Sequence, residues 1–343
     1  MQGKAVSIYD IAKLAGVSTA TVSKVLNGKG SISQATRERV LDIARKEGYV
    51  ASFAARSLSR GDTHTVGIVV PDVSNPFFSR LVRRVETLLY DAGYICYICD
   101  TGSDKDRAKR CVENLMQRQV GGLVFVNARF ELGELGIADG LPVVEVDPAM
   151  RPKRPWTVAV GNDFSAMARD AVRLLARRGC QRISLLSVFT GATSSDGEWM
   201  GFRSTLAEFG LIPDRNLVLV GPHLKESRLE AAELVGQCLD DGYTIDGIAC
   251  LGDRIALGAC QALRERGLGI GHDVLVIGMD NSLLSRVAVP AISSVDRHEG
   301  EMAERGVEAL LSMMEGVEPY EDHITIGYDI VERESTLGSA ERP

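Results

Sequence analysis

Short β-rich runs alternate with stretches of helical periodicity from Thr65 onward, and this alternation constrains the fold more than any other feature of the sequence. Strands are predicted at Val66–Val70, Tyr94–Cys99, Gly122–Val126, Val143–Val146, Ile183–Leu186, Gly247–Cys250 and Val274–Gly278. Helices are predicted between them, for example over Phe77–Ala92, Ser165–Arg178 and Asp253–Arg266. Strands that alternate with helices favour parallel sheets with right-handed crossovers. The body of the chain is therefore predicted to be α/β, with doubly wound parallel sheets.

The length of 343 residues is enough for two to three domains at about 150 residues each, and two wound lobes fit the part after Thr65. A chain of this size buries a core without disulfide or metal staples. Its 45% apolar and 25% charged residues are typical of a globular protein. It has no run approaching the ~20 apolar residues of a membrane span, and charges near the N-terminus interrupt any apolar signal-peptide core. We therefore expect a protein that is neither membrane-bound, secreted nor disordered.

Charge is distributed unevenly along the chain. Residues 1–60 hold ten Lys/Arg and four Asp/Glu, a net charge of +6, whereas the remainder holds 29 bases and 42 acids, a net charge of −13. A basic head on an acidic body indicates that only the head meets a polyanion. Charge alone is a weak indication, since many small domains are basic without binding one.

The basic head is predicted to hold three short helices. The first has an apolar stripe that ends at Gly16, where a helix C-terminus favours a residue with positive φ. Ser18 and Ser33 are suited to cap the second and third helices. The second helix turns a polar face outward, formed by Ala20, Ser23, Lys24 and Asn27. Two helices joined by a glycine turn are typical of the helix-turn-helix, although a three-helix domain without a ligand has the same pattern.

Four segments carry a resemblance to a known family: SIYDIAKLAGVSTATVSKVLN over 7–27, ISQATRERV over 32–40, AARSL over 54–58 and VGIVVPDVSNPFF over 66–78. They resemble the lactose-repressor (LacI) family, and the similarity in layout covers essentially the whole chain. The resemblance implies an all-α helix-turn-helix headpiece over 1–50, a hinge helix over 51–61 and a two-lobed periplasmic-binding-protein-like core over 62–343. Three strands would cross between the lobes, near Val160, Ile292 and His323. Lobe 1 is then expected over about 62–160 and 292–322, and lobe 2 over about 161–291 and 323–338.

The same resemblance implies a function. The protein would be a transcriptional regulator, expected to be a repressor, that binds a pseudo-palindromic operator in double-stranded DNA. A small-molecule effector between the lobes, expected to be a carbohydrate-related metabolite, would control operator affinity. The location would be cytoplasmic and nucleoid-associated, and no cofactor or metal is expected.

By resemblance, base contacts would come from Thr19, Ala20, Lys24 and Leu58, the last as a minor-groove wedge of the hinge. Phosphate contacts would come from Ser7, Tyr9, Ser18, Thr21, Ser23, Asn27, Ser33 and Thr36. For Lys24 the chemistry agrees, because lysine to guanine is a common specific contact. The chain departs from the family before the hinge, where Ala51-Ser52 replaces the usual Pro-Asn, so we expect a hinge helix with a weaker boundary.

Polar residues follow several predicted strands, at the carboxyl ends where parallel sheets bind ligands. With the resemblance, the expected effector residues are Asp72, Asn75, Phe77, Phe78, Asp147, Ser194, Glu198, Asp253, Asp280 and Arg297. The two phenylalanines fit the inward face of their helix equally well. Arg297 and His298 also fit a solvated helix start, so the role of Arg297 stays open.

Three expected pocket positions differ from the family. Glu198 stands where an arginine is frequent, Gly252 where an asparagine is frequent, and His223 near a frequent aromatic residue. An exchange of arginine for glutamate reverses the local charge and removes five hydrogen-bond donors. Either the ligand differs from the usual sugar or purine, for example by carrying a cation or several hydroxyl donors, or the site is vestigial.

Other classes of function find less support. The sequence holds no G-x-G-x-x-G after the first strand, no G-x-x-x-x-G-K-[ST], no G-x-S-x-G and no H-x-x-x-H, so we do not expect an enzyme. Cys96 and Cys99 are three apart in a predicted strand and would point to opposite faces, which disfavours a metal site; the seven cysteines are expected to be buried thiols. Two alternatives remain: a solute-binding transport component, and a regulator that answers to a protein partner.

The expected assembly is a homodimer. A helix-turn-helix head reads a half-site, so two heads related by a twofold axis match a pseudo-palindrome. The tail Arg333–Pro343 has one leucine and no heptad pattern, so no tetramer-forming zipper is expected.

Overall fold

The computed structural model describes residues 6–26, 30–49, 63–128, 130–148, 154–187, 202–212, 217–220 and 227–337. The chain divides into two compact units, Met1–His64 and Thr65–Pro343.

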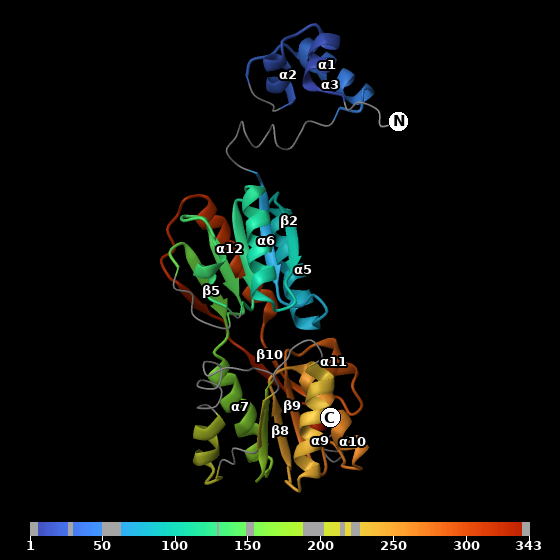
Figure 1. Ribbon diagram of the computed structural model, residues 1–343, viewed down its shortest axis with the longest axis vertical. Helices are drawn as coiled ribbons and strands as arrows, with labels where there is room; N and C mark the ends of the chain where they lie inside the picture. Colours follow the sequence, from blue (N-terminus) through green and yellow to red (C-terminus); the bar gives the residue numbers. More distant parts are fainter. Residues whose placement is uncertain are drawn as a thin grey trace. The chain divides into compact units, whose positions relative to one another are not determined.

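The N-terminal unit contains three helices, α1 (Ile8–Ala15), α2 (Thr19–Leu26) and α3 (Gln34–Lys46) (Figure 1). Each helix contributes to one small core, with Ile11, Val22 and Val40 fully buried. Ser7 and Asp10 form a reciprocal capping box at the start of α1, and Gly16 ends the helix with φ of 64°. The predicted three-helix layout, its inward face and its caps are confirmed.

The C-terminal unit is built on two six-stranded sheets. Sheet A has the order β11-β5-β4-β3-β1-β2, with β1 (Thr65–Val70), β2 (Ile95–Asp100), β3 (Gly122–Val126), β4 (Val143–Val146), β5 (Thr157–Gly161) and β11 (His323–Thr325). Sheet B has the order β12-β10-β9-β8-β6-β7, with β6 (Ile183–Ser187), β7 (Val218–Val220), β8 (Gly247–Cys250), β9 (Leu275–Met279), β10 (Ser293–Asp296) and β12 (Asp329–Val331). Among the described strands, β12 alone runs antiparallel to its neighbour. The predicted pair of doubly wound parallel sheets is confirmed.

Helices cover both faces of each sheet. In the half built on sheet A, called lobe 1, these are α5 (Pro76–Asp91) and α12 (Glu299–Met314) on one face and α6 (Lys105–Gln117) and η1 (Leu132–Leu135) on the other. In the half built on sheet B, called lobe 2, they are α7 (Phe164–Arg177) and residues 202–208 on one face and α9 (Ser227–Asp240) and α10 (Asp253–Glu265) on the other. Two short helices, α11 (Leu283–Val287) and α13 (Glu334–Leu337), complete lobe 2.

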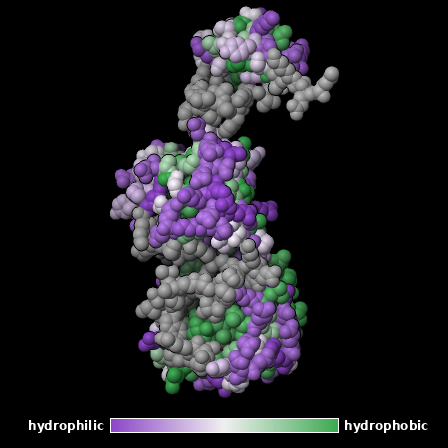
Figure 2. All heavy atoms as spheres, viewed as in Figure 1, coloured by the Kyte–Doolittle hydropathy of each residue, from purple (hydrophilic) through white to green (hydrophobic). Residues whose placement is uncertain are grey.

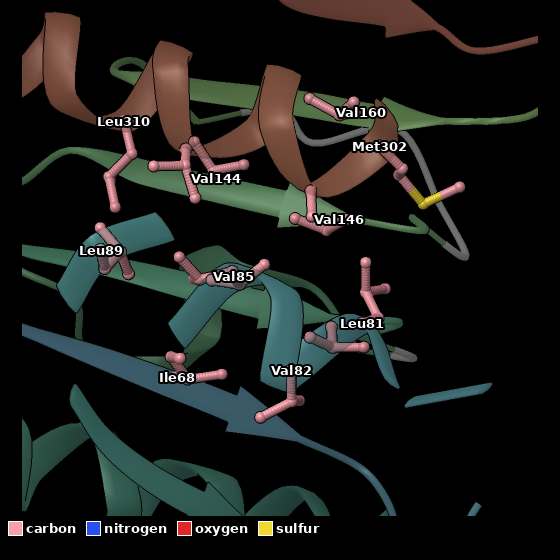
Figure 3. Close-up of a cluster of buried hydrophobic side chains, with 14 of the residues drawn as sticks. Ile68, Leu81, Val82, Val85, Leu89, Val144, Val146, Val160, Met302 and Leu310 are labelled. Carbon is pink, nitrogen blue, oxygen red and sulfur yellow. The ribbon is translucent and has the colours of Figure 1, made fainter. Parts of the chain in front are cut away.

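The period-two pattern of the strands explains why both faces are covered. On β1, Ile68 faces the core shared with α5 and α12, whereas Val69 faces the core under α6. Figure 3 shows Leu89 of α5 beside Leu310 of α12, with Val85 and Leu81 following along α5 over the strands. The outer face of α6 is hydrophilic, as Figure 2 shows, because its apolar residues all turn inward. Among the described residues, no helix has the length and apolar character that crossing a bilayer requires.

Strand pairing corrects two of the expected crossings between the lobes. The crossing expected near Val160 lies between β5 and α7. The crossing expected near Ile292 comes later, because β10 (Ser293–Asp296) still pairs with β9 in sheet B. The crossing expected near His323 also comes later, because His323 to Thr325 form β11 beside β5 in sheet A. The chain therefore changes lobes at about 162–163, 297–298 and 326–328.

Candidate ligand site and nucleic-acid interface

The outward face of α2 lies open on the N-terminal unit. Ala20 and Lys24 are exposed and Thr19 is half-buried, whereas Val22 and Val25 on the other side are buried. Lys24 is therefore the cation of α2 that can reach a neighbouring surface. Asn27 and Leu58, which were expected to contact phosphate and bases, lie outside the described residues.

The hydroxyls expected to contact phosphate lie at helix starts. Ser18 Oγ accepts a hydrogen bond from the Thr21 amide at 3.1 Å, and Ser33 Oγ accepts one from the Thr36 amide at 3.4 Å. Ser7 caps α1 in the same way, and Tyr9 beside it is 74% exposed. Three helix N-termini of one small unit thus carry a capping hydroxyl group, and helix N-termini attract anions.

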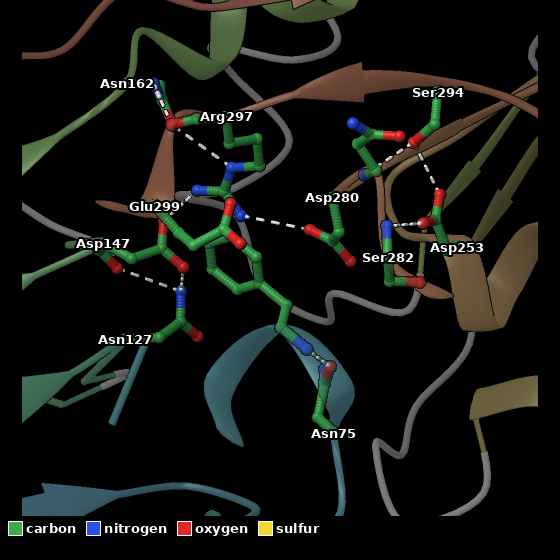
Figure 4. A network of polar contacts seen from close by, with 12 residues as sticks. Asn75, Asn127, Asp147, Asn162, Asp253, Asp280, Ser282, Ser294, Arg297 and Glu299 are labelled. Carbon is green, nitrogen blue, oxygen red and sulfur yellow. Dashed lines mark hydrogen bonds and ion pairs between the residues drawn. The ribbon is translucent and has the colours of Figure 1, made fainter. Parts of the chain in front are cut away.

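A buried guanidinium lies between the two lobes of the C-terminal unit. Arg297, on the second crossing, has a side chain only 4% exposed (Figure 4). It donates to the Asp147 carboxylate, at the end of β4, and to Asp280 Oδ1, at the end of β9, over 3.4 Å. The expectation of a solvated helix start is wrong for Arg297, because burial of a charge requires the partners that these carboxyl groups provide.

Two aromatic rings also contact this guanidinium. The Arg297 Cζ lies 4.3 Å from the ring centroid of Phe77 and 4.7 Å from that of Phe164, both within the range of cation–π attraction. Phe77 lies in the first turn of α5 in lobe 1, and Phe164 begins α7 in lobe 2. Phe77, which the sequence left open between core and pocket, is buried in the lobe 1 core and also contacts Arg297.

Asn162 binds the three crossings together. Its Nδ2 lies within hydrogen-bond distance of the carbonyl oxygens of Arg297 (3.2 Å), Ile326 (3.1 Å) and Gly327 (2.9 Å). Its Oδ1 accepts from Arg297 Nε at 3.2 Å. The first crossing is therefore bonded through one buried side chain to the other two.

Asp253 has a structural role within lobe 2 and is not available to a ligand. The side chain is 1% exposed, accepts from Ser294 Oγ and from the Ser282 amide, both at 2.6 Å, and lies within lobe 2. Burial raises its pKa, and the hydrogen bonds oppose that rise. Because serine donors of its own lobe already occupy both carboxyl oxygens, Asp253 joins β10 to α10 and does not reach the crossing residues.

The remaining expected residues fall in several places. Asn75 caps α5 through a bond from the Phe77 amide, and Phe78 packs in the lobe 1 core. Asp72 accepts from Arg254 of α10 at 2.8 Å, which joins the lobes at a second position. Ser194 and Glu198 lie outside the described residues, as does His223. The structure therefore brings together Phe77, Asp147, Asp280 and Arg297 from the expected set.

Sequence reasoning missed four residues of this region: Arg80, Asn162, Phe164 and Arg254. Arg80 of α5 donates to the Asp280 carbonyl oxygen at 2.9 Å and pairs with Glu299 at 2.8 Å. Asn162 and Phe164 both follow the end of β5. The rule that ligand residues follow the carboxyl ends of strands, which selected Asp147, could therefore have found them too. The two arginines lie inside helices and give no local signal.

The burial of the Asp280 carboxyl group predicts that the stability of the protein depends on pH. Burial raises the pKa of this carboxyl to about 8, against the opposing effect of Arg297. The folded chain therefore keeps a proton that the unfolded chain has lost, and stability falls as pH rises from about 4 to about 8, by at most about 1.4 kcal/mol per pH unit. In Asp280→Asn, urea unfolding between about pH 5 and 8 should show a shallower decline. An equal decline of stability with pH in both proteins would contradict the raised pKa of Asp280.

The fold and these two sites define a class: a helix-turn-helix DNA-binding regulator with a two-lobed periplasmic-binding-protein-like core. Residues 7–52 match the model for bacterial regulatory proteins of the lacI family, and residues 172–336 match a periplasmic binding protein-like domain. The ribose operon repressor of Halalkalibacterium halodurans is 30% identical over 97% of each chain. The chain belongs to the lacI family and is a DNA-binding transcriptional regulator.

Two solved structures share the fold. The lac repressor dimer bound to operator and an anti-inducer has a TM-score of 0.82 at 22% identity, with 98% of this chain and 100% of that one covered. The complex of the transcriptional regulator CelR with cellobiose has a TM-score of 0.69 at 25% identity, with 96% and 99% covered.

Proposed function

We propose that the protein represses transcription by binding a pseudo-palindromic operator, and that a small molecule held between the lobes controls this binding. The observation that carries the first half is the exposed face of α2 beside three hydroxyl-capped helix starts. Binding to DNA and ligand, without catalysis, is the whole activity, and it takes place in the cytoplasm at the nucleoid.

In the proposed complex, α2 enters the major groove. Thr19, Ala20 and Lys24 contact base edges, and Leu58 of the hinge at 51–61 contacts the minor groove. The phosphates are held by Ser7, Tyr9, Ser18, Thr21, Ser23, Asn27, Ser33 and Thr36. These hydroxyl and amide groups position the head on the duplex, whereas the face of α2 selects the sequence.

The effector binds where the crossings meet. Phe77, Asp147 and Asp280 supply a ring and polar groups from both lobes around Arg297, and Ser194 and Glu198, outside the described residues, are further candidates from the sequence. A carbohydrate-related effector is supported by the relatives, one named for a ribose operon and one solved with cellobiose. Ligand binding changes operator affinity only as far as it favours one arrangement of the lobes.

The test is a fluorescence-anisotropy titration of the full chain against an inverted-repeat operator and a scrambled duplex. The plot of log affinity against log salt should have a slope near −0.9Z for Z neutralised phosphates. Candidate sugars are then added at constant salt. Equal binding to both duplexes would refute the operator assignment, and operator binding that no ligand alters would favour a regulator that answers to a protein partner.

Lys24 offers a residue-level check. Lys24→Ala should weaken operator binding by about 10- to 100-fold, since a direct base contact contributes roughly 1–3 kcal/mol of discrimination. The loss should be largest for the operator and small for scrambled DNA. Lys46→Ala is the matched control, because Lys46 ends α3 and pairs with Asp42. An equal loss on both duplexes would place Lys24 on phosphate instead.

A homodimer is supported by the edge of sheet A. β2 is the outermost strand, and Ile95 and Ile98 on it are 59% and 49% exposed, with Tyr97 also exposed. An edge strand with apolar side chains and unpaired backbone groups favours a second copy. Ile98→Asp should shift the full chain from dimer to monomer in sedimentation velocity, whereas Ile212→Asp, at a 91% exposed position of lobe 2, should not. An unchanged dimer would exclude β2 from the interface.

A further inference from the structure

The two lobes contribute equally to the surroundings of Arg297. Each lobe contributes one aromatic ring and one carboxyl group: Phe77 and Asp147 from lobe 1, Phe164 and Asp280 from lobe 2. The contacts of the guanidinium N–H groups are all to oxygen acceptors, since the third partner is Asn162 Oδ1. We call these five residues around Arg297 the cation cage.

The chemistry of the cage suits a cation better than a neutral molecule. The aromatic faces and the Asp147 carboxylate present negative potential, the Asp280 carboxyl group adds an acceptor oxygen, and aromatic cages recognise ammonium groups. Asn127 Nδ2 donates to Asp147 Oδ2 at 3.1 Å, which fixes the direction of that carboxylate. A group with several N–H donors and a positive charge satisfies all the members at once, as Arg297 does.

We propose that the cation cage is the recognition site for a positively charged nitrogen group, and that Arg297 fills it as an internal ligand until an effector with an ammonium or guanidinium group takes its place. This proposal depends on the proposed function only in assuming that an effector binds between the lobes. The cage itself couples occupancy to lobe closure, because a cation there is held by both lobes. The effector class that follows is a carbohydrate-related molecule with a protonated amine.

The experiment empties the cage and refills it with a matched pair of small probes. In Arg297→Ala, the thermal midpoint should fall by about 6–10 °C, because removal of one partner leaves buried carboxyl groups without it. Guanidinium chloride at about 20 mM should then restore about 3 °C in a saturable way, as expected for a millimolar Kd. Urea, which is planar and of the same size but neutral, should restore nothing.

Three controls define the outcome. Arg254→Ala removes another guanidinium that joins the lobes, through Asp72, and neither it nor the unaltered chain should respond to guanidinium. Arg297→Ala combined with Phe164→Leu should lose the response. A response to urea equal to that of guanidinium, or none to either, overturns the proposal. Operator binding measured in parallel separates this failure from that of the proposed function, since the headpiece is unaltered.

Should Arg297→Ala not fold, a second pair decides the question. Arg297→Lys keeps a cation in the cage, whereas Arg297→Met has similar length and no charge. The lysine variant should have the higher thermal midpoint. A methionine variant of equal or higher midpoint would show that the site requires only a filled volume, and would overturn the proposal.

Discussion

Asn162→Leu should lower the free energy of unfolding of the two-lobed core by about 3 kcal/mol, since each buried polar group left without a partner costs roughly 1–3 kcal/mol. The amide contacts three carbonyl oxygens, and its own oxygen accepts from Arg297 Nε. Leucine keeps the number and branching of the side-chain heavy atoms but is larger, so the loss combines the missing hydrogen bonds with some overpacking. Urea denaturation followed by circular dichroism gives the value.

The control for Asn162 is Asn114→Leu. Asn114 on α6 is exposed and donates one bond to the Arg110 carbonyl oxygen at 2.8 Å, so its loss should cost well under about 1 kcal/mol. The Asn162 variant should also blunt any effect of ligand on operator affinity, because the crossings are no longer bonded to each other. A cost for Asn162 as small as that for Asn114 would mean that the crossings are held mainly by other contacts.

Gly258→Ala should destabilise lobe 2 by about 3 kcal/mol or more, at the upper end of the range for overpacking. A Cβ at this position of α10 would lie 2.1 Å from the Arg228 carbonyl oxygen and 2.7 Å from the Ala231 Cβ on α9. Backbone cannot yield as a flexible side chain does, so the two helices must move apart and the packing beneath them must open.

The matched glycine is Gly300, in the first turn of α12, where an added Cβ meets nothing within 4 Å. Gly300→Ala should be neutral or stabilising by up to about 1 kcal/mol, because alanine favours the helix. Thermal unfolding of both variants compares the two positions directly. A loss at Gly258 no larger than the change at Gly300 would refute the close approach of α9 and α10.

Local patterns predicted the parts of the fold that local physics decides. Apolar periodicity and capping residues located the headpiece helices, and strands such as Gly122–Val126 were found at their observed bounds. The crossings expected near Ile292 and His323 were misplaced because pairing between distant segments decides them. β10 begins with two serines and has no apolar strand pattern, so only its pairing with β9 assigns it to sheet B.

For the candidate site, too, local sequence predicted some residues, whereas contacts between distant segments decided the others. The strand-end rule found Asp147 and Asp280, whose positions depend on one strand each. It also selected Asp253, since nothing in the local sequence reveals that Ser282 and Ser294 lie beside that carboxyl group. Arg297 looked like a surface residue because its partners come from four segments far apart in the chain, and only the folded core brings them to one point.

The order of strands in the two sheets has a consequence for synthesis on the ribosome. Each sheet takes an outermost strand, β11 or β12, from residues near 323–331, whereas the three headpiece helices end at Lys46. Domains fold as units as they are translated. The nascent chain therefore carries a finished DNA-binding head through most of its elongation, before either lobe has its full set of strands.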